Sequence, residues 1–170
     1  IDNVGCIAVA AAVVEENFDL PTAVVNTPDT ITCTDLEVTL DGTGSSTGPD
    51  LTATWSGPGL SGNPGLTATA EQAGIYQLSV SNEVNGCVAE ATVIVEADND
   101  PPDIELQESF ITCADPQAVI GTLGSAEGPQ LVYNWAGPGL VSGGNTLSPT
   151  VDVPGTYSVT VTDNLTGCVA

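Results

Sequence analysis

Alternation of apolar and polar residues is the clearest pattern in the chain, and within Gly74–Asp103 it predicts two neighbouring strands. Tyr76–Val80 and Val88–Val95 each alternate with a period of two, and the turn residues Asn85-Gly86 stand between them. Because Asn and Gly accept the positive φ angles of a tight turn, this arrangement predicts a β-hairpin. Pro101-Pro102 follows within an acidic stretch, which is expected to end the sheet.

The hairpin pattern returns at Gly155–Ala170, so the chain is a tandem repeat. The cysteine that follows the turn recurs every 81 residues, as Cys6, Cys87 and Cys168, whereas Cys33 and Cys113 are 80 residues apart. Short strands separated by Gly- and Pro-rich turns at so long a period predict an all-β chain of tandem β-sandwich domains in a linear array, rather than a solenoid.

Three parts are expected along the chain. Residues 1–17 read as the terminal strand of a preceding repeat, residues 18–97 as a first sandwich and residues 98–170 as a second. No segment keeps a 3.6-residue period over a useful length, so essentially no helix is expected. The remaining strands are predicted at Ile31–Cys33, Leu36–Leu40, Leu51–Trp55 and Leu66–Ala70, and again at Phe110–Cys113, Ala118–Ile120, Leu131–Trp135, Leu147–Val151 and Tyr157–Val161.

The second sandwich lacks a counterpart of the strand Ala89–Val95. An open sandwich exposes apolar side chains and unpaired backbone groups, so another strand must cover it. Either the residues that follow in one continuous chain supply this strand, or Ile7–Val14 of a neighbouring subunit inserts there. Cys6 and Cys168 hold the same repeat position, so insertion would duplicate the cysteine, which favours the continuous chain.

Composition removes several functional classes. The chain has 22 Asp and Glu and no Lys, Arg or His, which gives a net charge of −22. Nucleic acids and anionic membrane surfaces need a basic partner surface and are therefore excluded as partners. Imidazole and amine chemistry is absent, and no acidic pair lies in a sequence typical of a glycosidase cleft, so we expect no enzyme. The hydrophobic content of 41% still supports a core.

The two tryptophans bear on sugar binding. Trp55 and Trp135 alternate with Leu and Ala on one face of their strands, which favours a place in the core. A ladder of exposed aromatic side chains would instead have indicated a carbohydrate-binding platform.

Five cysteines leave one unpaired. The even solution pairs Cys33 with Cys87 and Cys113 with Cys168, and leaves Cys6 for a partner outside this segment. Each such bridge would close a loop of about 55 residues and stabilise its domain by about 4 kcal/mol in the chain-entropy model. Zinc is the alternative, but it prefers closely spaced cysteine pairs. Disulfides imply an oxidising, extracytoplasmic location.

Three strings carry a resemblance to a known type: LDGTGSS at Leu40–Ser46, AGIYQLSVSNEVNGC at Ala73–Cys87 and PGTYSVTVTDNLTGC at Pro154–Cys168. They resemble the polycystic-kidney-disease-type (PKD-like) and related immunoglobulin-like repeats that are common in large surface and secreted proteins of Bacteroidota. The resemblance implies tandem immunoglobulin-like sandwiches, an extracellular or cell-surface location, and a role in an adhesin or fibre.

The junctions between repeats are rich in oxygen ligands. Asp98-Asn99-Asp100 before a proline resembles the cadherin linker, which implies calcium at the joint. Calcium takes six to eight oxygen ligands and would neutralise such a cluster, although a solvated acidic linker explains the same residues. The candidate ligands are Asp98, Asn99, Asp100 and Asp103 at one junction and Glu15, Glu16, Asn17 and Asp19 at the other.

Two short patterns suggest glycans. Asn164-Leu165-Thr166 is an N-glycosylation sequon, and Asp29-Thr30-Ile31 is similar to the O-glycan acceptor of secreted Bacteroidota proteins, which would place a glycan on Thr30.

These observations favour a non-catalytic structural segment of an extracellular fibre or adhesin stalk, with neighbouring copies of the same repeat or subunit as partners. Like charge on every domain would keep such an array extended and soluble. The alternative is a ligand- or carbohydrate-binding accessory module of a secreted hydrolase.

Overall fold

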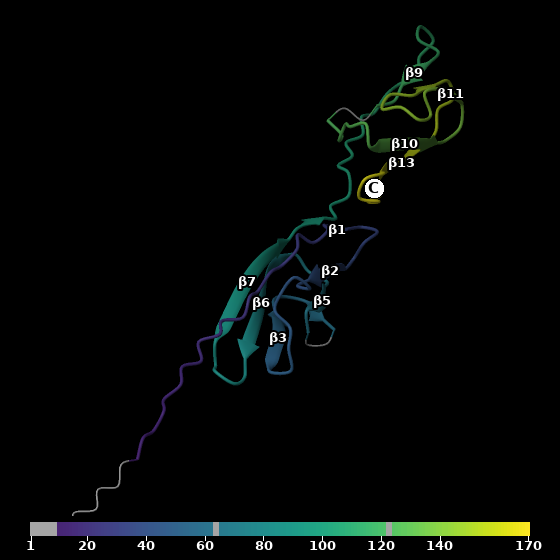
Figure 1. Cartoon of the computed structure of the whole chain (residues 1–170). Coiled ribbons are helices and arrows are strands. Elements are labelled where there is room, and N and C mark those ends of the chain that lie inside the picture. Colours follow the sequence, from purple (N-terminus) through teal and green to yellow (C-terminus); the bar gives the residue numbers. More distant parts are fainter. Residues whose placement is uncertain (1–9, 63–64, 122–123) are drawn as a thin grey trace, which may run out of the picture.

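The strands of the computed structural model follow one another along an elongated chain (Figure 1). The structure describes residues 10–62, 65–121 and 124–170, and these ranges contain thirteen strands and no helix. Strands β1 to β8 pair only among themselves, as do β9 to β13. The all-β prediction is confirmed.

The first sandwich is built from two three-stranded sheets. One sheet has the order β3-β6-β7, from Leu51–Ser56, Gly74–Asn82 and Val88–Val95. The other has the order β2-β5-β4, from Val38–Asp41, Thr67–Ala70 and Leu60–Ser61. A short parallel pair joins β1, Ile31–Thr32, to β8, Ala97–Asp98.

Alternation decides which side chains fill the space between these two sheets. Leu78 and Val80 of β6 are fully buried, and Leu40 of β2 meets them from the facing sheet within one core cluster. Trp55 belongs to the same cluster and is 7% exposed. Side chains two apart on a strand share a face, so the pattern read from the sequence places the core correctly.

The second sandwich repeats this plan with fewer pairings. Strand β10, Leu131–Ala136, pairs with β13, Ser158–Asp163. The facing sheet has the order β11-β12-β9, from Leu140–Ser142, Thr150–Val151 and Ala118–Val119. Its core cluster contains Trp135, which is 6% exposed, together with Tyr133 and Val161. Two facing antiparallel sheets around one core make each unit an immunoglobulin-like β-sandwich.

The predicted hairpin is confirmed, although β6 extends two residues beyond the predicted Tyr76–Val80 at each end. Strand β7 matches the predicted Val88–Val95, and it pairs with β6 from Gly74↔Val95 to Ser81↔Val88. The turn is longer than a two-residue Asn-Gly turn, because Gly86 N donates to Asn82 O at 2.8 Å and, of the turn residues, only Gly86 has a positive φ, of +74°.

Several predicted strands were wrong in extent. Leu36 is exposed and precedes β2, and β12 covers only the end of Leu147–Val151. Phe110–Cys113 forms no strand, whereas its counterpart β1 forms one because β8 pairs with it. The short strands β4, β8 and β11 were not predicted, because two or three residues carry no visible period.

A repeated tyrosine contact closes one end of each sandwich. The Tyr76 hydroxyl shares its one proton between the Pro58 carbonyl and the Gln72 carbonyl, the latter at 2.6 Å, and Tyr157 has the matching contacts with Pro138 and Val153. Burial raises the pKa of Tyr76 above its ordinary value. A Cβ at Gly57 would come within 2.3 Å of the Tyr76 ring, so glycine lets the backbone lie against that ring.

The segment that enters each sandwich is held by a buried serine. Ser45 Oγ accepts from Val24 N at 2.9 Å and donates to Val24 O at 3.0 Å. Ser125 holds Glu105 in the same way, at 2.8 and 3.3 Å. The repeat therefore extends to the polar contacts that fix the entry of the chain.

Residues 10–17, the described part of the segment before the first sandwich, have no strand partner. Residues 10–17 are exposed and lie outside every strand, with Val14 91% exposed. Their prediction as the last strand of a preceding repeat, and the boundaries at residues 17 and 97, stay predictions. Residues 1–9, with Cys6, lie outside the described residues.

Candidate functional site

A disulfide between the two sandwiches is the main feature of the junction. Cys33, which follows β1, is bonded to Cys168 in the turn that follows β13. The S–S distance is 2.00 Å and the Cα atoms lie 5.0 Å apart, although the two residues are 135 positions apart in the sequence. A second covalent connection between the sandwiches is the chain itself, through Pro101-Pro102.

Backbone contacts seat the turn around the bridge. Cys33 N donates to Thr166 O at 3.1 Å, and Thr34 Oγ1 donates to the same carbonyl at 3.5 Å. Thr166 is buried, and its Oγ1 accepts from Cys168 N at 3.3 Å. The bridge therefore lies within a packed contact and does not span a gap.

The predicted pairing of the cysteines within each sandwich was wrong. Cys87 lies at the start of β7, whereas Cys33 lies beside β8, which follows the other end of β7. Eight residues of strand span about 25 Å, and a disulfide needs Cα atoms within about 7 Å. Cys33 and Cys87 are thus at opposite ends of one sandwich, and Cys113 and Cys168 hold the same repeat positions in the other.

Cys87 and Cys113 are free thiols. Cys113 is exposed and Cys87 is partly exposed. The sequence did offer one signal, which is the repeat. Cys33 and Cys113 hold one repeat position, Cys87 and Cys168 hold the other, and one cysteine of each position is bonded across the junction.

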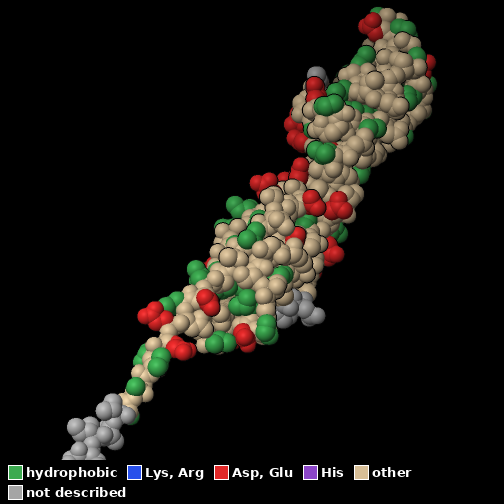
Figure 2. All heavy atoms as spheres, viewed as in Figure 1, with side chains coloured by type: hydrophobic (Ala, Val, Ile, Leu, Met, Phe, Trp, Pro, Cys, Tyr) green, Lys and Arg blue, Asp and Glu red, His purple; other side chains and the backbone are tan. Residues whose placement is uncertain are grey.

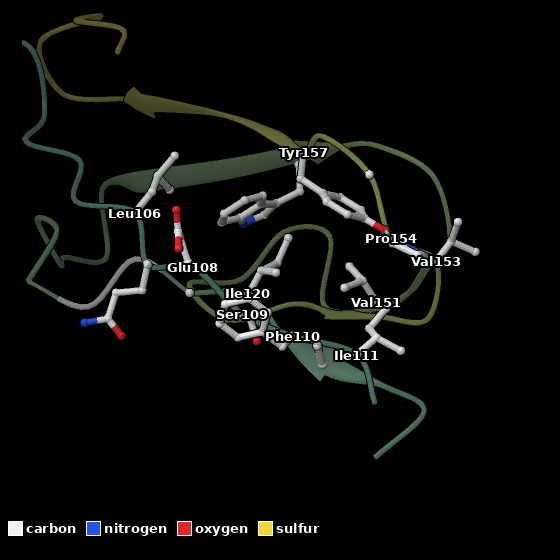
Figure 3. Close-up of a pocket in the computed structure, with 15 residues that line it drawn as sticks. Leu106, Glu108, Ser109, Phe110, Ile111, Ile120, Val151, Val153, Pro154 and Tyr157 are labelled. Atoms are coloured by element: carbon white, nitrogen blue, oxygen red, sulfur yellow. Dashed lines mark hydrogen bonds between the residues drawn. The ribbon is translucent and has the colours of Figure 1, made fainter. Parts of the chain in front are cut away.

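An apolar pocket of about 560 Å³ opens on the second sandwich. Figure 3 shows Tyr157 on one side of it and Phe110 and Ile111 on the other. In the first sandwich the counterpart of Ile111 is Ile31, which is buried, and Val95 of β7 is only 1% exposed there. The pocket therefore corresponds to a part of the core that the end of β7 helps to fill in the first sandwich.

The start of the covering strand is present beside β13. Thr162 forms a bridge with Val169, and Val161 and Ala170 exchange two backbone hydrogen bonds of 2.9 Å. The register is that of Ser81↔Val88 and Val80↔Ala89 in the first sandwich. A strand that continued in this register would run along the pocket.

The acidic junction residues are dispersed. Figure 2 shows acidic side chains spread along the visible face rather than gathered at one place. In residues 10–62, 65–121 and 124–170, no three Asp, Glu, His or Cys side chains form a group that could hold a metal ion. Calcium binding by Asp98, Asn99, Asp100 and Asp103, or by Glu15, Glu16, Asn17 and Asp19, stays an untested prediction.

The two candidate glycan sites differ in access. Thr30 is exposed, next to exposed Asp29, just before β1. Asn164 is also exposed, but its backbone N donates to Gln130 O at 2.9 Å in the tight turn, and Thr166 of the sequon is buried. Of the two sites, Thr30 presents the more accessible acceptor.

No helix among the described residues has the length and apolar character to cross a membrane. No family model matches the sequence, and neither does any curated protein.

Thirty chains of solved structures are similar to this chain, and three of them illustrate how long and weak the likeness is. The three N-terminal domains of the Highly Immunogenic Outer Capsid protein (Hoc) of bacteriophage RB49 share 19% identity at a TM-score of 0.44, covering 88% of this chain and 56% of that chain. Protocadherin Gamma B7 extracellular cadherin domains 1–4 share 13% identity at 0.36, over 84% and 46%. The titin domains z1z2, solved in complex with telethonin, share 14% at 0.28, over 90% of both chains. This chain thus spans about half the length of the first two. With TM-scores below 0.5, none of these likenesses bears on function, and the fold assignment rests on the sheets described above.

Proposed function

We propose that this chain is a load-bearing segment of an extracellular fibre or adhesin stalk, and that it is not catalytic. The observation that carries the proposal is the Cys33–Cys168 bridge, which joins the beginning of one sandwich to the end of the next. A bridge placed between domains does little for the core of either domain, but it fixes how the two domains are joined.

The bridge changes the path of a pulling force. Tension that enters before Cys33 and leaves after Cys168 passes through the disulfide, so the residues between them carry none of it. Those residues include every strand from β2 to β13. A stalk with this connection resists tension without relying on the strength of its sheets.

The same bridge limits bending. One flexible linker would let two domains swivel freely, whereas the linker at Pro101-Pro102 and the disulfide together hold the joint at two places. Proline also restricts its own φ angle and the conformation of the residue before it. The junction is therefore stiff in at least one direction.

Charge supports an extended array. The net charge is −22 and there are no Lys, Arg or His side chains to neutralise it (Figure 2). Like-charged domains repel one another, which keeps neighbouring stalks apart and soluble. The absence of Lys and Arg also removes every cleavage site for trypsin-like proteases.

The finer assignment rests on the resemblance and on the redox state. The strings that resemble PKD-like repeats support placement in a large surface protein of Bacteroidota type. Disulfides persist mainly in oxidising compartments, which supports a secreted or cell-surface location. Neighbouring repeats of the same kind are the expected partners.

The pocket does not favour the alternative of a carbohydrate-binding module. Two of its three aromatic side chains, Trp135 and Tyr157, correspond to Trp55 and Tyr76, which are buried in the first sandwich, and Trp135 is buried here as well. The third, Phe110, is exposed, but a single exposed ring does not make a platform.

Electron microscopy of the native assembly tests the proposal. We expect thin, unbranched fibres with a regular series of domain-sized beads that stay straight under oxidising conditions and curl after reduction. Compact soluble particles attached to a catalytic domain would contradict the stalk and support the accessory module.

A further inference from the structure

We infer that Cys87 and Cys113 each form an interdomain disulfide of the Cys33–Cys168 kind, and that the partner of each is a cysteine of a neighbouring repeat. Cys87 would pair with the Cys33-type cysteine of a repeat placed before it, and Cys113 with the Cys168-type cysteine of a repeat placed after it. This inference deepens the proposed stalk function, on which it rests for its biological setting, by naming the partner as another copy of the repeat.

The Cys113 side reproduces the local structure around Cys33. In the first sandwich Thr32 N donates to Asp35 O at 2.8 Å, and Asp35 N donates to Thr32 Oγ1 at 3.0 Å. Around Cys113 the matching bonds, from Thr112 N to Asp115 O and from Asp115 N to Thr112 Oγ1, measure 2.9 and 3.0 Å. Cys113 is thus presented in the same turn as its bonded counterpart, but exposed.

The Cys87 side likewise reproduces the turn that carries Cys168. Asn82 N donates to Cys87 O at 2.8 Å and Gly86 N donates to Asn82 O at 2.8 Å. The matching bonds around Cys168, from Asp163 N to Cys168 O and from Gly167 N to Asp163 O, measure 2.9 and 2.8 Å. The glycine φ angles agree as well, at +74° for Gly86 and +72° for Gly167.

The turn that carries Cys168 is covered by a neighbouring sandwich, whereas the turn that carries Cys87 is not. A Cβ at Gly167 would come within 2.2 Å of Thr34 Cγ2, because the neighbouring sandwich packs against it. A Cβ at Gly86 would meet nothing within 4 Å. The space beside the Cys87 turn is therefore open, where the equivalent space beside the Cys168 turn is filled by the neighbouring sandwich.

The chain that enters each sandwich also passes close to a cysteine of this kind. Asn85 Nδ2 donates to Asn17 Oδ1 at 2.9 Å and to Asp19 O at 3.0 Å, which holds the entering segment beside Cys87. At the closed junction, Asn99 O of the entering segment lies 3.4 Å from Cys33 Sγ. Both thiols thus lie at the ends of the two-sandwich unit, where a further repeat would dock.

Formation of each bridge is a two-electron oxidation. Two thiols lose two protons and two electrons, a new S–S bond forms, and a disulfide oxidant such as oxidised glutathione is reduced to two thiols. Exchange runs through a mixed disulfide on one of the cysteines, which the exposed Cys113 can form.

Bridges repeated in this way would interleave. The loop from Cys33 to Cys168 contains Cys113, so the loop that begins at Cys113 overlaps it. The stretch between Cys113 and Cys168 would then lie inside two loops at once. Breakage of one bridge in such an array would leave this stretch protected by the next.

The test uses the purified chain with Cys6→Ser, so that only Cys87 and Cys113 are free beside the Cys33–Cys168 bridge. The chain is incubated in a buffer of oxidised and reduced glutathione. Products are separated by non-reducing electrophoresis, and their links are mapped by mass spectrometry after cleavage with a Glu- and Asp-specific protease. We expect a ladder of oligomers joined by Cys87–Cys113 links, which should outnumber each like-with-like link by about tenfold because docking raises the effective concentration of the matched thiol.

Single changes at the two thiols are the controls. Cys87→Ser and Cys113→Ser, each in the Cys6→Ser background, should abolish the ladder and leave monomers with at most a minor like-with-like dimer, and the far-ultraviolet circular dichroism should stay unchanged. Like-with-like links in statistical proportion, or monomers that keep both thiols under conditions that close Cys33–Cys168, would overturn the inference while leaving the stalk proposal standing. Failure of Cys33–Cys168 itself to form would instead remove the observation that carries the stalk proposal.

Reducing, denaturing electrophoresis of the native assembly distinguishes the two sources of the neighbouring repeat. A band near 17.0 kDa, the mass of this segment, would show that the bridges join separate subunits, whereas a much larger band would show that they join repeats of one polypeptide. Either band, with Cys87–Cys113-type links present before reduction, supports the inference. The absence of those links from the native assembly overturns it.

Discussion

Gly167 lies so close to Thr34 that any side chain at position 167 would strike it, since a Cβ there would come within 2.2 Å of Thr34 Cγ2. Thr34 belongs to the first sandwich and Gly167 to the second. Their contact lies beside the Cys33–Cys168 bridge, because each of the two residues is next to one of the bonded cysteines in the sequence.

Gly167→Ala should loosen this junction, and Gly86→Ala is its matched control. Both glycines have a positive φ near +70°, so both changes carry the same backbone cost of about 1–2 kcal/mol. Only Gly167→Ala adds a collision with the other sandwich. We expect similar loss of melting temperature from the backbone term, but a higher equilibrium fraction of reduced Cys33 and Cys168 in glutathione buffer for Gly167→Ala alone. Equal redox equilibria in the two variants would contradict the packing described here.

Tyr76→Phe should destabilise the first sandwich by about 1–3 kcal/mol, because it leaves the Pro58 and Gln72 carbonyls without their donor. Tyr157→Phe should cost less, since Tyr157 is partly exposed and water can replace its hydroxyl. Burial raises the folded-state pKa of Tyr76 above 10.0, so its contribution is complete below that pH and is lost as the pH rises through the folded value. Urea unfolding between pH 8 and pH 11 measures both effects. If the free energy of unfolding falls above about pH 10 to the same extent in Tyr76→Phe, the loss does not come from ionisation of Tyr76.

Salt should stabilise this protein at every concentration. Most proteins contain attractive ion pairs, which salt screens. Here the charged side chains are all acidic, so every interaction between two of them is repulsive, and salt weakens this repulsion. Raising NaCl from ~10 mM to ~500 mM should raise the melting temperature, and tetramethylammonium chloride should act equally, since screening depends on ionic strength alone.

Calcium at matched ionic strength tests the junction acids separately. Calcium at the joint predicts a larger shift of the melting temperature with calcium than with magnesium, whereas a solvated acidic linker predicts equal shifts with the two ions. A larger shift with calcium, removed by Asp98→Asn with Asp100→Asn, would support the calcium joint, and equal shifts would support the solvated linker.

Extension of the chain past Ala170 should close the pocket of the second sandwich. The added residues would copy Glu90–Asp98, so that the strand begun at Val169 and Ala170 continues beside β13. Its valine that corresponds to Val95 would be buried against the pocket wall, which contributes about 1.5–3 kcal/mol. Calorimetry should show a higher melting temperature for the second sandwich. The same extension with Asp in place of that valine should lose the gain, and equal effects of the two extensions would argue against this reading of the pocket.

Alternation in the sequence was enough to locate the hairpin, the main strands and the core tryptophans. Strand β7 was predicted to the residue because eight alternating positions and an Asn-Gly turn define it. Strands of two or three residues, such as β4 and β8, were missed because so short a stretch has no period. Phe110–Cys113 was predicted by analogy with β1, yet that strand depends on a partner, β8, far along the chain.

The junction was beyond reach for a different reason. The spacing of Cys33 and Cys87 suggested a bridge within one domain. Only the parallel pairing of β1 with β8 shows that these cysteines lie at opposite ends of the first sandwich. Nothing local at Cys33 or Cys168 encodes their contact across 135 residues. The repeat carried the information, since it fixed which cysteines are equivalent and therefore which remain open.

Single-molecule force spectroscopy on the chain held at its two ends tests the central claim, that tension passes through the Cys33–Cys168 bridge and bypasses every strand from β2 to β13. With the bridge intact, only the segment before Cys33, which includes β1, can peel from the first sandwich, because the residues between Cys33 and Cys168 lie outside the force path. After reduction, or in Cys33→Ser with Cys168→Ser, the two sandwiches should unfold and release up to roughly 450 Å of chain at 3.3–3.6 Å per residue. The same released length with and without reductant would contradict the account.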